Sequence, residues 1–245
     1  MGTKRKRQQL HERNQLAEQE YKSGAIKKNF QPQDLKFIRP KTKTQEDLFQ
    51  AFHQANLFLY GSAGTGKTFL SMYLALREVL EGKFRRLIII RSVVPSRDTG
   101  FLPGTLEEKI AVYEQPYRTI CNQLFPYSKS YDNLKKGGYV EFMTTSFLRG
   151  DTLDDCIVLV DEIQNMNFQE ADTIITRFGE NTKIIFAGDT SQTDLNKKYD
   201  KSGMLEFMRI IEGMDEFEMV RFMPQDVVRS GLVKSYLLRK EALSL

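Results

Sequence analysis

Residues 61–68 constrain this chain more than any other segment, because they read Gly-Ser-Ala-Gly-Thr-Gly-Lys-Thr and directly follow an apolar run at 57–60. Glycines let the backbone curl until successive N–H groups point at one centre, and a helix that starts there adds the positive end of its dipole. This turn between a strand and a helix is the phosphate-binding P-loop. A glycine turn without a ligand would not need all the fixed positions that this sequence has.

Each residue of the loop has an expected role when a nucleoside triphosphate is bound. We expect Lys67 to reach the β- and γ-phosphates and the Thr68 hydroxyl to ligate magnesium. The other loop residues are expected to surround the phosphates with backbone N–H groups, namely Gly61, Ser62, Ala63, Gly64, Thr65 and Gly66. The loop therefore predicts ATP and Mg²⁺ as cofactors.

Two further strand ends carry side chains that suit the hydrolysis of a triphosphate. An apolar run ends in Asp161 and Glu162, and a second apolar run, 183–187, is followed by Gln192. We expect Asp161 to hold magnesium through water and Glu162 to act as general base on the attacking water. The amide of Gln192 can donate to a phosphate oxygen and accept from that water, so it is a candidate γ-phosphate sensor. Taken alone, Gln192 is equally compatible with a polar turn.

Strands alternate with helices along residues 41–245, which we interpret as one domain after a basic, partly disordered extension over residues 1–40. The alternation predicts an α/β fold with a mostly parallel sheet covered on both faces. Strands are predicted at 57–60, 86–91, 139–143, 156–161, 183–187 and 217–222, and helices at 45–55, 67–81, 105–124, 168–178, 203–211 and 227–240. Thr44 is the predicted N-cap of the first helix.

Composition limits the class of protein. Hydrophobic residues make up 40% and charged residues 28% of the chain, as in an average globular protein. No apolar run approaches the ~18 residues of a membrane span, and the N-terminus lacks the apolar core of a signal peptide, so we expect a cytoplasmic protein with no membrane partner. Cys121 and Cys156 have no Cys-x-x-Cys partner, which indicates neither a disulfide framework nor a zinc site.

Together these segments resemble the PhoH family of P-loop ATPases, which is related to the first RecA-like domain of superfamily 1 helicases. Besides the P-loop, the similar segments are Asp161-Glu162-Ile-Gln164-Asn165, Gly188-Asp189-Thr-Ser-Gln192-Thr-Asp194-Leu195, Gly100-Phe-Leu-Pro-Gly104, Phe147-Leu-Arg149-Gly150-x-Thr152-Leu153 and Asp226-Val-Val-Arg229. The resemblance spans about residues 40–240. It implies a three-layer RecA-like fold in which the strand ending at Gly188 lies between the P-loop strand and the Asp161 strand. It also implies that Gln45 contacts the adenine edge, although an exposed polar residue is the alternative.

The resemblance further implies nucleic acid as a partner. The segment after the strand 86–91 corresponds to the helicase segment that holds a nucleic-acid backbone, and the candidates are Arg91, Ser92, Arg97 and Lys109. Arginine and hydroxyl side chains contact phosphates without reading sequence, so RNA or single-stranded DNA would bind in a salt-sensitive way. The first 44 residues hold twelve Lys/Arg against four Asp/Glu. This basic arm is either a second phosphate contact or a solvated tail.

Superfamily 1 helicases use a second RecA-like domain to supply arginines across the nucleotide, and this sequence shows one such domain. We therefore expect a homo-oligomer, in the form of a ring that could be hexameric, whose neighbouring subunit supplies an arginine finger. Arg177 and Arg229 are the candidates, and a structural ion pair is the alternative for each.

The preferred interpretation is an oligomeric, helicase-like ATPase that acts on RNA or single-stranded nucleic acid. One alternative is a nucleotide-dependent switch or scaffold without motor action. A second alternative is a nucleoside kinase, because some thymidine kinases combine a P-loop with Asp-Glu-x-Gln. Those enzymes usually carry a four-cysteine zinc lobe, and two cysteines cannot form it.

Overall fold

The computed structural model describes residues 29–92, 106–148, 150, 152–189 and 206–243. The chain divides into two compact units, Met1–Phe37 with Gly104–Val140 and Ile38–Pro103 with Glu141–Leu245. Across the described residues, no helix combines the length and the apolar character that a membrane span needs. The predicted boundary at residue 40, between a basic extension and an ATPase domain, stays a prediction.

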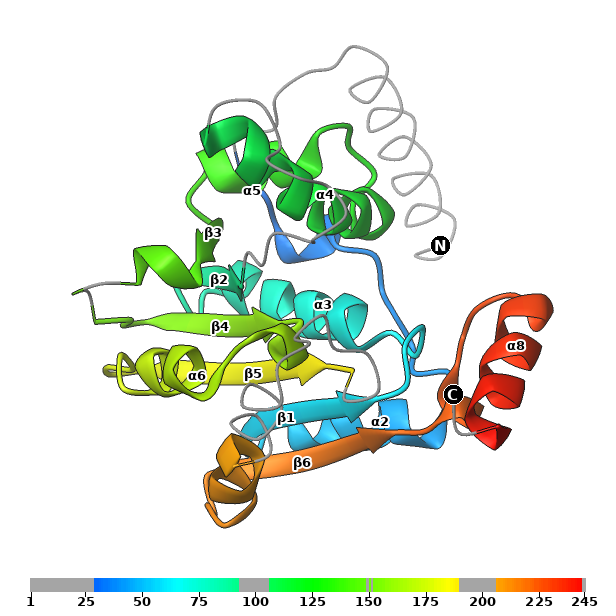
Figure 1. Cartoon of the computed structure of the whole chain (residues 1–245). Coiled ribbons are helices and arrows are strands. Elements are labelled where there is room, and N and C mark those ends of the chain that lie inside the picture. The colour runs from blue at the N-terminus through cyan, green and yellow to red at the C-terminus, as the bar shows by residue number, and fades with distance from the viewer. Residues whose placement is uncertain (1–28, 93–105, 149, 151, 190–205, 244–245) are drawn as a thin grey trace, which may run out of the picture. The chain divides into compact units, whose positions relative to one another are not determined.

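A six-stranded parallel sheet is the framework of the larger unit (Figure 1). The strands are β1 (Asn56–Gly61), β2 (Arg86–Arg91), β3 (Val140–Thr144), β4 (Cys156–Asp161), β5 (Thr182–Gly188) and β6 (Phe217–Phe222). Their order across the sheet is β3-β2-β4-β5-β1-β6. All six predicted strands are present to within one residue at each end. The predicted RecA-like arrangement is confirmed, because β5 pairs with β1 on one side and with β4 on the other.

The strands are buried on both faces, as the unbroken apolar runs predict. Successive side chains of a strand point to opposite faces, so alternate residues form one cluster. One face carries the cluster of Phe58, Ile88, Ile90, Val158, Val160, Ile184 and Phe186, which packs against Ala171 and Ile174 of a helix and against Phe207 and Ile211. The other face contacts the helix that follows the P-loop. The larger unit therefore has three layers.

The helices of the larger unit are α2 (Lys43–Ala51), α3 (Lys67–Leu80), α6 (Phe168–Ile175), α8 (Gly231–Ala242) and the helical residues 206–212. Short 3₁₀ helices are η2 (Thr145–Phe147), η3 (Ile163–Asn165) and η4 (Pro224–Asp226). The prediction of Thr44 as N-cap is wrong: the hydroxyl of Thr42 accepts the hydrogen bond from the N–H of Gln45. Thr44 instead donates to Asp226 Oδ2 at 3.0 Å. The helix expected from residue 227 begins at 231, because η4 and an extended stretch come first.

The smaller unit contains η1 (Pro32–Asp34), α4 (Leu106–Leu124) and α5 (Ser130–Lys136). Phe30 is the centre of an aromatic cluster, with ring centroids 5.1 Å from Phe125 and 6.2 Å from Tyr127. The Tyr127 hydroxyl also donates to Asp34 at 2.8 Å. These contacts attach residues 30–37 to a segment about ninety positions away, which no local pattern predicts. The helix α5 was not predicted, because its seven residues are too few to show a helical period, with only Tyr131 and Leu134 as apolar residues.

Cys121 and Cys156 lie in different units, and both are buried free thiols. Burial raises the pKa of the Cys156 thiol to about 11, so the uncharged form persists at neutral pH. Neither thiol forms a disulfide, and among the described residues no group of three or more His, Cys, Asp or Glu could hold a metal ion.

Gly61 allows β1 and β6 to approach at the start of the P-loop. It has a φ of +114°, and a Cβ atom there would lie 2.0 Å from the carbonyl oxygen of Phe222. We expect Gly61→Ala to lower the free energy of unfolding by more than about 2 kcal/mol, measured by urea denaturation without nucleotide. The matched control is Gly82→Ala, which has a φ of +77° but open space around the new methyl group. It should cost only ~1 kcal/mol, and equal losses for both variants would contradict the proposed clash.

Candidate active site

The P-loop forms the turn that its sequence predicts, between β1 and α3. Gly66 has a φ of +92° and is the N-cap of α3, so the helix points its positive end into the loop. Lys67 is the first helical residue, and its ammonium group donates to the carbonyl oxygens of Gly61 and Ser62, each at 2.8 Å. The Lys67 side chain therefore lies along the loop, where the phosphates of a nucleotide would be.

Burial lowers the pKa of Lys67 below its ordinary value. The negative charges of Asp189, Asp161 and Glu162 oppose that shift, in this order. These three carboxylates come from the ends of β4 and β5, so they lie within electrostatic reach of the P-loop lysine. A phosphate group would supply further negative charge to this partly desolvated ammonium.

The end of β4 meets the P-loop directly. The Thr68 hydroxyl donates to Asp161 Oδ1 at 2.9 Å, although 93 residues separate the two in sequence. A hydroxyl and a carboxylate are hard oxygen ligands, and magnesium is usually bound by one or two such groups together with waters and phosphates. The pair therefore fits the donor set that the sequence predicted for magnesium.

Glu162 follows in a strained conformation, with a φ of +54° that few non-glycine residues adopt. This turn ends β4 and exposes about two fifths of the Glu162 side chain, which is 38% accessible. The Glu162 carboxylate accepts a hydrogen bond from the amide of Gln164. Strain at such a position is a common property of residues with a functional role.

Gln164 is a residue whose role the sequence reasoning missed, although it lies in one of the family segments. Its amide donates to Glu162 and its oxygen accepts from the N–H of Asp189 at 2.9 Å. The side chain is buried and bridges the ends of β4 and β5. Gly188 permits this bridge, because a Cβ there would lie 2.5 Å from the oxygen of Gln164. The signal that could have identified Gln164 is its position two residues after the predicted base.

Gln45 contacts the P-loop rather than solvent. Its amide donates to the carbonyl oxygen of Thr65 at 2.9 Å, and its oxygen accepts from the N–H of Lys41 at 2.8 Å. The side chain is 3% exposed, so it is not a surface residue of the first helical turn. Contact with adenine stays a prediction, and in this structure Gln45 joins α2 to the loop.

Arg229 also lies against the P-loop of its own chain. The N–H of Val228 donates to the carbonyl oxygen of Gly64 at 3.1 Å, and a Cβ on Gly64 would lie 3.1 Å from Cγ of Arg229. Asp226, just before, is anchored to α2 by Thr44. The segment after β6 therefore forms one side of the nucleotide-binding edge.

The predicted nucleic-acid residues are only partly described. Arg91 ends β2, and its guanidinium lies 4.0 Å from Glu162 Oε1. Ser92 donates to Glu170 Oε1 at 3.2 Å. Lys109 belongs to α4 of the other unit and its side chain is not described, while Arg97 and Gln192 lie outside the described residues.

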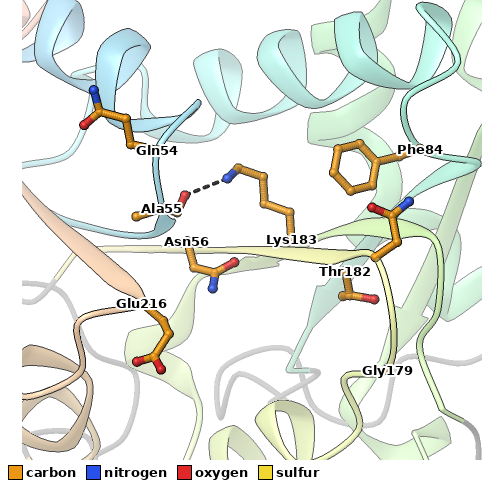
Figure 2. A pocket seen from close by; sticks show the side chains of 9 residues that line it. Gln54, Ala55, Asn56, Phe84, Gly179, Thr182, Lys183 and Glu216 are labelled. Atoms are coloured by element: carbon orange, nitrogen blue, oxygen red, sulfur yellow. Dashed lines mark hydrogen bonds between the residues drawn. The ribbon is translucent and has the colours of Figure 1, made fainter.

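Arg177 is remote from the P-loop of its own chain. Its carbonyl oxygen accepts from the N–H of Leu153, which precedes β4, so it lies at the amino ends of the strands. The same edge contains a pocket of about 490 Å³, lined by residues that include Asn56, Phe84 and Lys183 (Figure 2). The Lys183 ammonium donates to the carbonyl oxygen of Ala55 at 2.6 Å, which is a structural contact. The side chains predicted to bind and hydrolyse the triphosphate lie at the opposite edge, at the carboxyl ends of the strands.

The buried amide of Gln45 should contribute to stability. We expect Gln45→Ala to lower the free energy of unfolding by about 1–3 kcal/mol, because it leaves the carbonyl of Thr65 and the N–H of Lys41 without this partner. Urea denaturation without nucleotide measures the change. Glu46→Ala, at an exposed position on the same helical turn, is the control and should change little. Equal stability of the Gln45 variant and the wild type would contradict the bridging role.

Comparison with known proteins assigns the chain to a family. The PhoH-like protein family matches residues 37–239. The chain is 35% identical over 200 residues to the PhoH-like protein of Bacillus subtilis, which covers 81% of this chain and 62% of that protein. It is 33% identical over 183 residues to Protein PhoH of Escherichia coli K12, covering 74% of this chain and 51% of that protein. The chain thus spans roughly half to two thirds of the length of these relatives.

Among solved structures, the chain is similar to the SWI2/SNF2 ATPase core of Sulfolobus solfataricus in complex with dsDNA, with a TM-score of 0.43 and 14% sequence identity. The match covers 79% of this chain and 46% of the chain in that structure. The family match covers most of the chain and includes the P-loop, Asp161, Glu162 and the segment around Arg229. The chain belongs to the PhoH family.

Proposed function

We propose that this chain binds ATP with Mg²⁺ and hydrolyses it as a helicase-like motor that acts on RNA or single-stranded DNA. The observation that carries the proposal is the meeting of Lys67, the Thr68–Asp161 pair and Glu162 at one edge of the sheet. A P-loop lysine, a hydroxyl–carboxylate pair and a separate carboxylate are the groups that such a hydrolysis requires.

Each of these groups has a distinct task. Lys67 neutralises the β- and γ-phosphates, for which it exchanges its contacts with the loop carbonyls. Thr68 and Asp161 would hold Mg²⁺, which when bound supplies charge neutralisation at the phosphate oxygens. Glu162 accepts the proton of the attacking water. Gln192 is proposed to sense the γ-phosphate, and Gln45 to contact adenine.

The neighbouring strand end supports nucleic acid as the partner. Arg91 is the last residue of β2 and Ser92 follows it, and β2 pairs with β4 so that Arg91 lies in register with Asp161. A strand of RNA or single-stranded DNA bound by Arg91 and Ser92 would touch the edge at which ATP is hydrolysed. Such binding requires phosphate contacts alone, so it should tolerate different sequences.

Assembly of identical copies, in a ring that could be hexameric, is proposed as the working form. Arg177 lies at the edge opposite its own P-loop, so as a finger it would have to act on the nucleotide of a neighbouring copy. Arg229 lies against its own Gly64, which suits an action within the same chain. Leu232 and Tyr236 on α8 are 83% and 64% exposed, an apolar surface that suits a contact between copies.

Variants at the lysine and at the base should separate binding from chemistry. Lys67→Ala is expected to weaken ATP binding at least tenfold, because it removes the cation that contacts the phosphates. Glu162→Gln is expected to bind ATP normally and to lower turnover by about 10²-fold or more. Fluorescent-nucleotide binding and phosphate release measure the two properties. Normal turnover by Glu162→Gln would exclude Glu162 as the base.

Nucleic acid and self-assembly should both affect hydrolysis. We expect the rate per chain to rise with single-stranded RNA or DNA, and also with protein concentration as copies associate. Phosphate-release assays at several protein concentrations, together with the molecular mass in solution with and without ATP, test this expectation. A monomer that hydrolyses ATP at full rate and ignores an oligonucleotide would contradict the motor.

A further inference from the structure

Both carboxylate oxygens of Glu162 face donor groups of the same chain. Oε2 accepts the hydrogen bond from the amide of Gln164, and Oε1 lies 4.0 Å from the Arg91 guanidinium. A general base has to offer an oxygen to the attacking water. In this structure the Gln164 amide occupies Oε2, and the Arg91 guanidinium lies at ion-pair distance from Oε1.

Arg91 reaches Glu162 because of the strand pairing. The register of β2 and β4 places Arg91 beside Asp161, so its side chain extends from the neighbouring strand end toward the next residue, Glu162. The Arg91 side chain is 20% exposed and that of Glu162 is 38% exposed. The pair is therefore at the rim, where a phosphate from solution can approach the guanidinium.

A second set of contacts joins the same two segments. Glu170, in the first turn of α6, accepts from Ser92 at 3.2 Å and from Thr145 at 2.6 Å. Glu170 also accepts from the N–H of Asn167 and so caps α6. The residues that follow β2 are thus attached to the chain that follows Glu162.

We propose that Arg91 is a positioning residue that restrains Glu162 until nucleic acid binds. When a nucleic-acid strand binds, one of its phosphates pairs with the Arg91 guanidinium, and Oε1 of Glu162 is released. Gln164 still holds Oε2 and so keeps the carboxylate oriented toward the site. Guanidinium and phosphate form a bidentate, charge-assisted pair, which is stronger than the present 4.0 Å approach to a carboxylate. This inference rests on the proposed ATP hydrolysis and explains how nucleic acid regulates that reaction.

The test compares Arg91→Gln with the wild type, without nucleic acid and at an oligonucleotide concentration that saturates each protein. The variant is expected to hydrolyse ATP roughly fivefold faster than the wild type without nucleic acid, the rate equivalent of about 1 kcal/mol for a rim ion pair. Saturating oligonucleotide should then add little. Arg85→Gln, an exposed arginine just before the other end of β2, is the control and should leave both rates unchanged.

Oligonucleotide affinity, measured by fluorescence anisotropy, separates this role from simple binding. If Arg91 only holds the strand, Arg91→Gln binds nucleic acid more weakly while its basal rate stays at or below that of the wild type, which overturns the restraint. Should Arg91→Gln melt at a lower temperature than the wild type, Arg91→Met keeps the apolar stem and gives the same comparison. If the wild type hydrolyses no ATP with any oligonucleotide, the proposed function itself is contradicted. If an oligonucleotide stimulates the wild type but the basal rate of Arg91→Gln equals that of the wild type, only the restraint is contradicted.

Discussion

The parallel pairing of β1, β5, β4 and β2 is the constraint on which the rest of the structure depends. Parallel strands deliver all their carboxyl ends to one edge, so the residues that follow four distant strands become neighbours. The 2.9 Å hydrogen bond between Thr68 and Asp161 is the most direct result, since it joins the P-loop helix to a strand end 93 residues away. Without this pairing, the P-loop would be an isolated anion-binding turn.

Around this edge the polar side chains bind one another. Lys67 donates to the loop carbonyls, Gln45 to Thr65, and Gln164 connects the ends of β4 and β5. Buried polar groups of this kind are costly unless each one has a partner, so together they fix the loop and the strand ends in a defined geometry. A nucleotide would therefore meet an edge that is largely formed in advance, which reduces the ordering that binding requires.

The same arrangement connects the nucleotide edge to a second surface. Arg91 lies beside Asp161 in the sheet, and Ser92 is bonded to Glu170 on the helix that follows Glu162. These contacts involve few side chains, so the proposed influence of nucleic acid on Glu162 would need no long pathway. The order of the strands alone makes the two candidate sites neighbours.

The sequence by itself determined the strands, the P-loop and the identity of the lysine, the hydroxyl and the two acidic residues at the end of β4. Continuous apolar runs bounded by turns specify buried strands, and the spacing of glycines specifies the loop, so both are local properties. Short elements were harder: α5 is too short to show a helical period, and α2 is capped by Thr42, whereas the Thr44 hydroxyl donates to Asp226.

Only the tertiary structure decided which side chains meet. The contacts of Gln164 with Asp189, Gln45 with Thr65, Arg91 with Glu162 and Arg229 with the P-loop all join segments that sequence proximity does not relate. The physical reason is that side-chain contacts across a sheet depend on strand order and register, and long-range pairing sets both. The sequence specified the chemical groups, whereas the parallel sheet brought them within reach of one another.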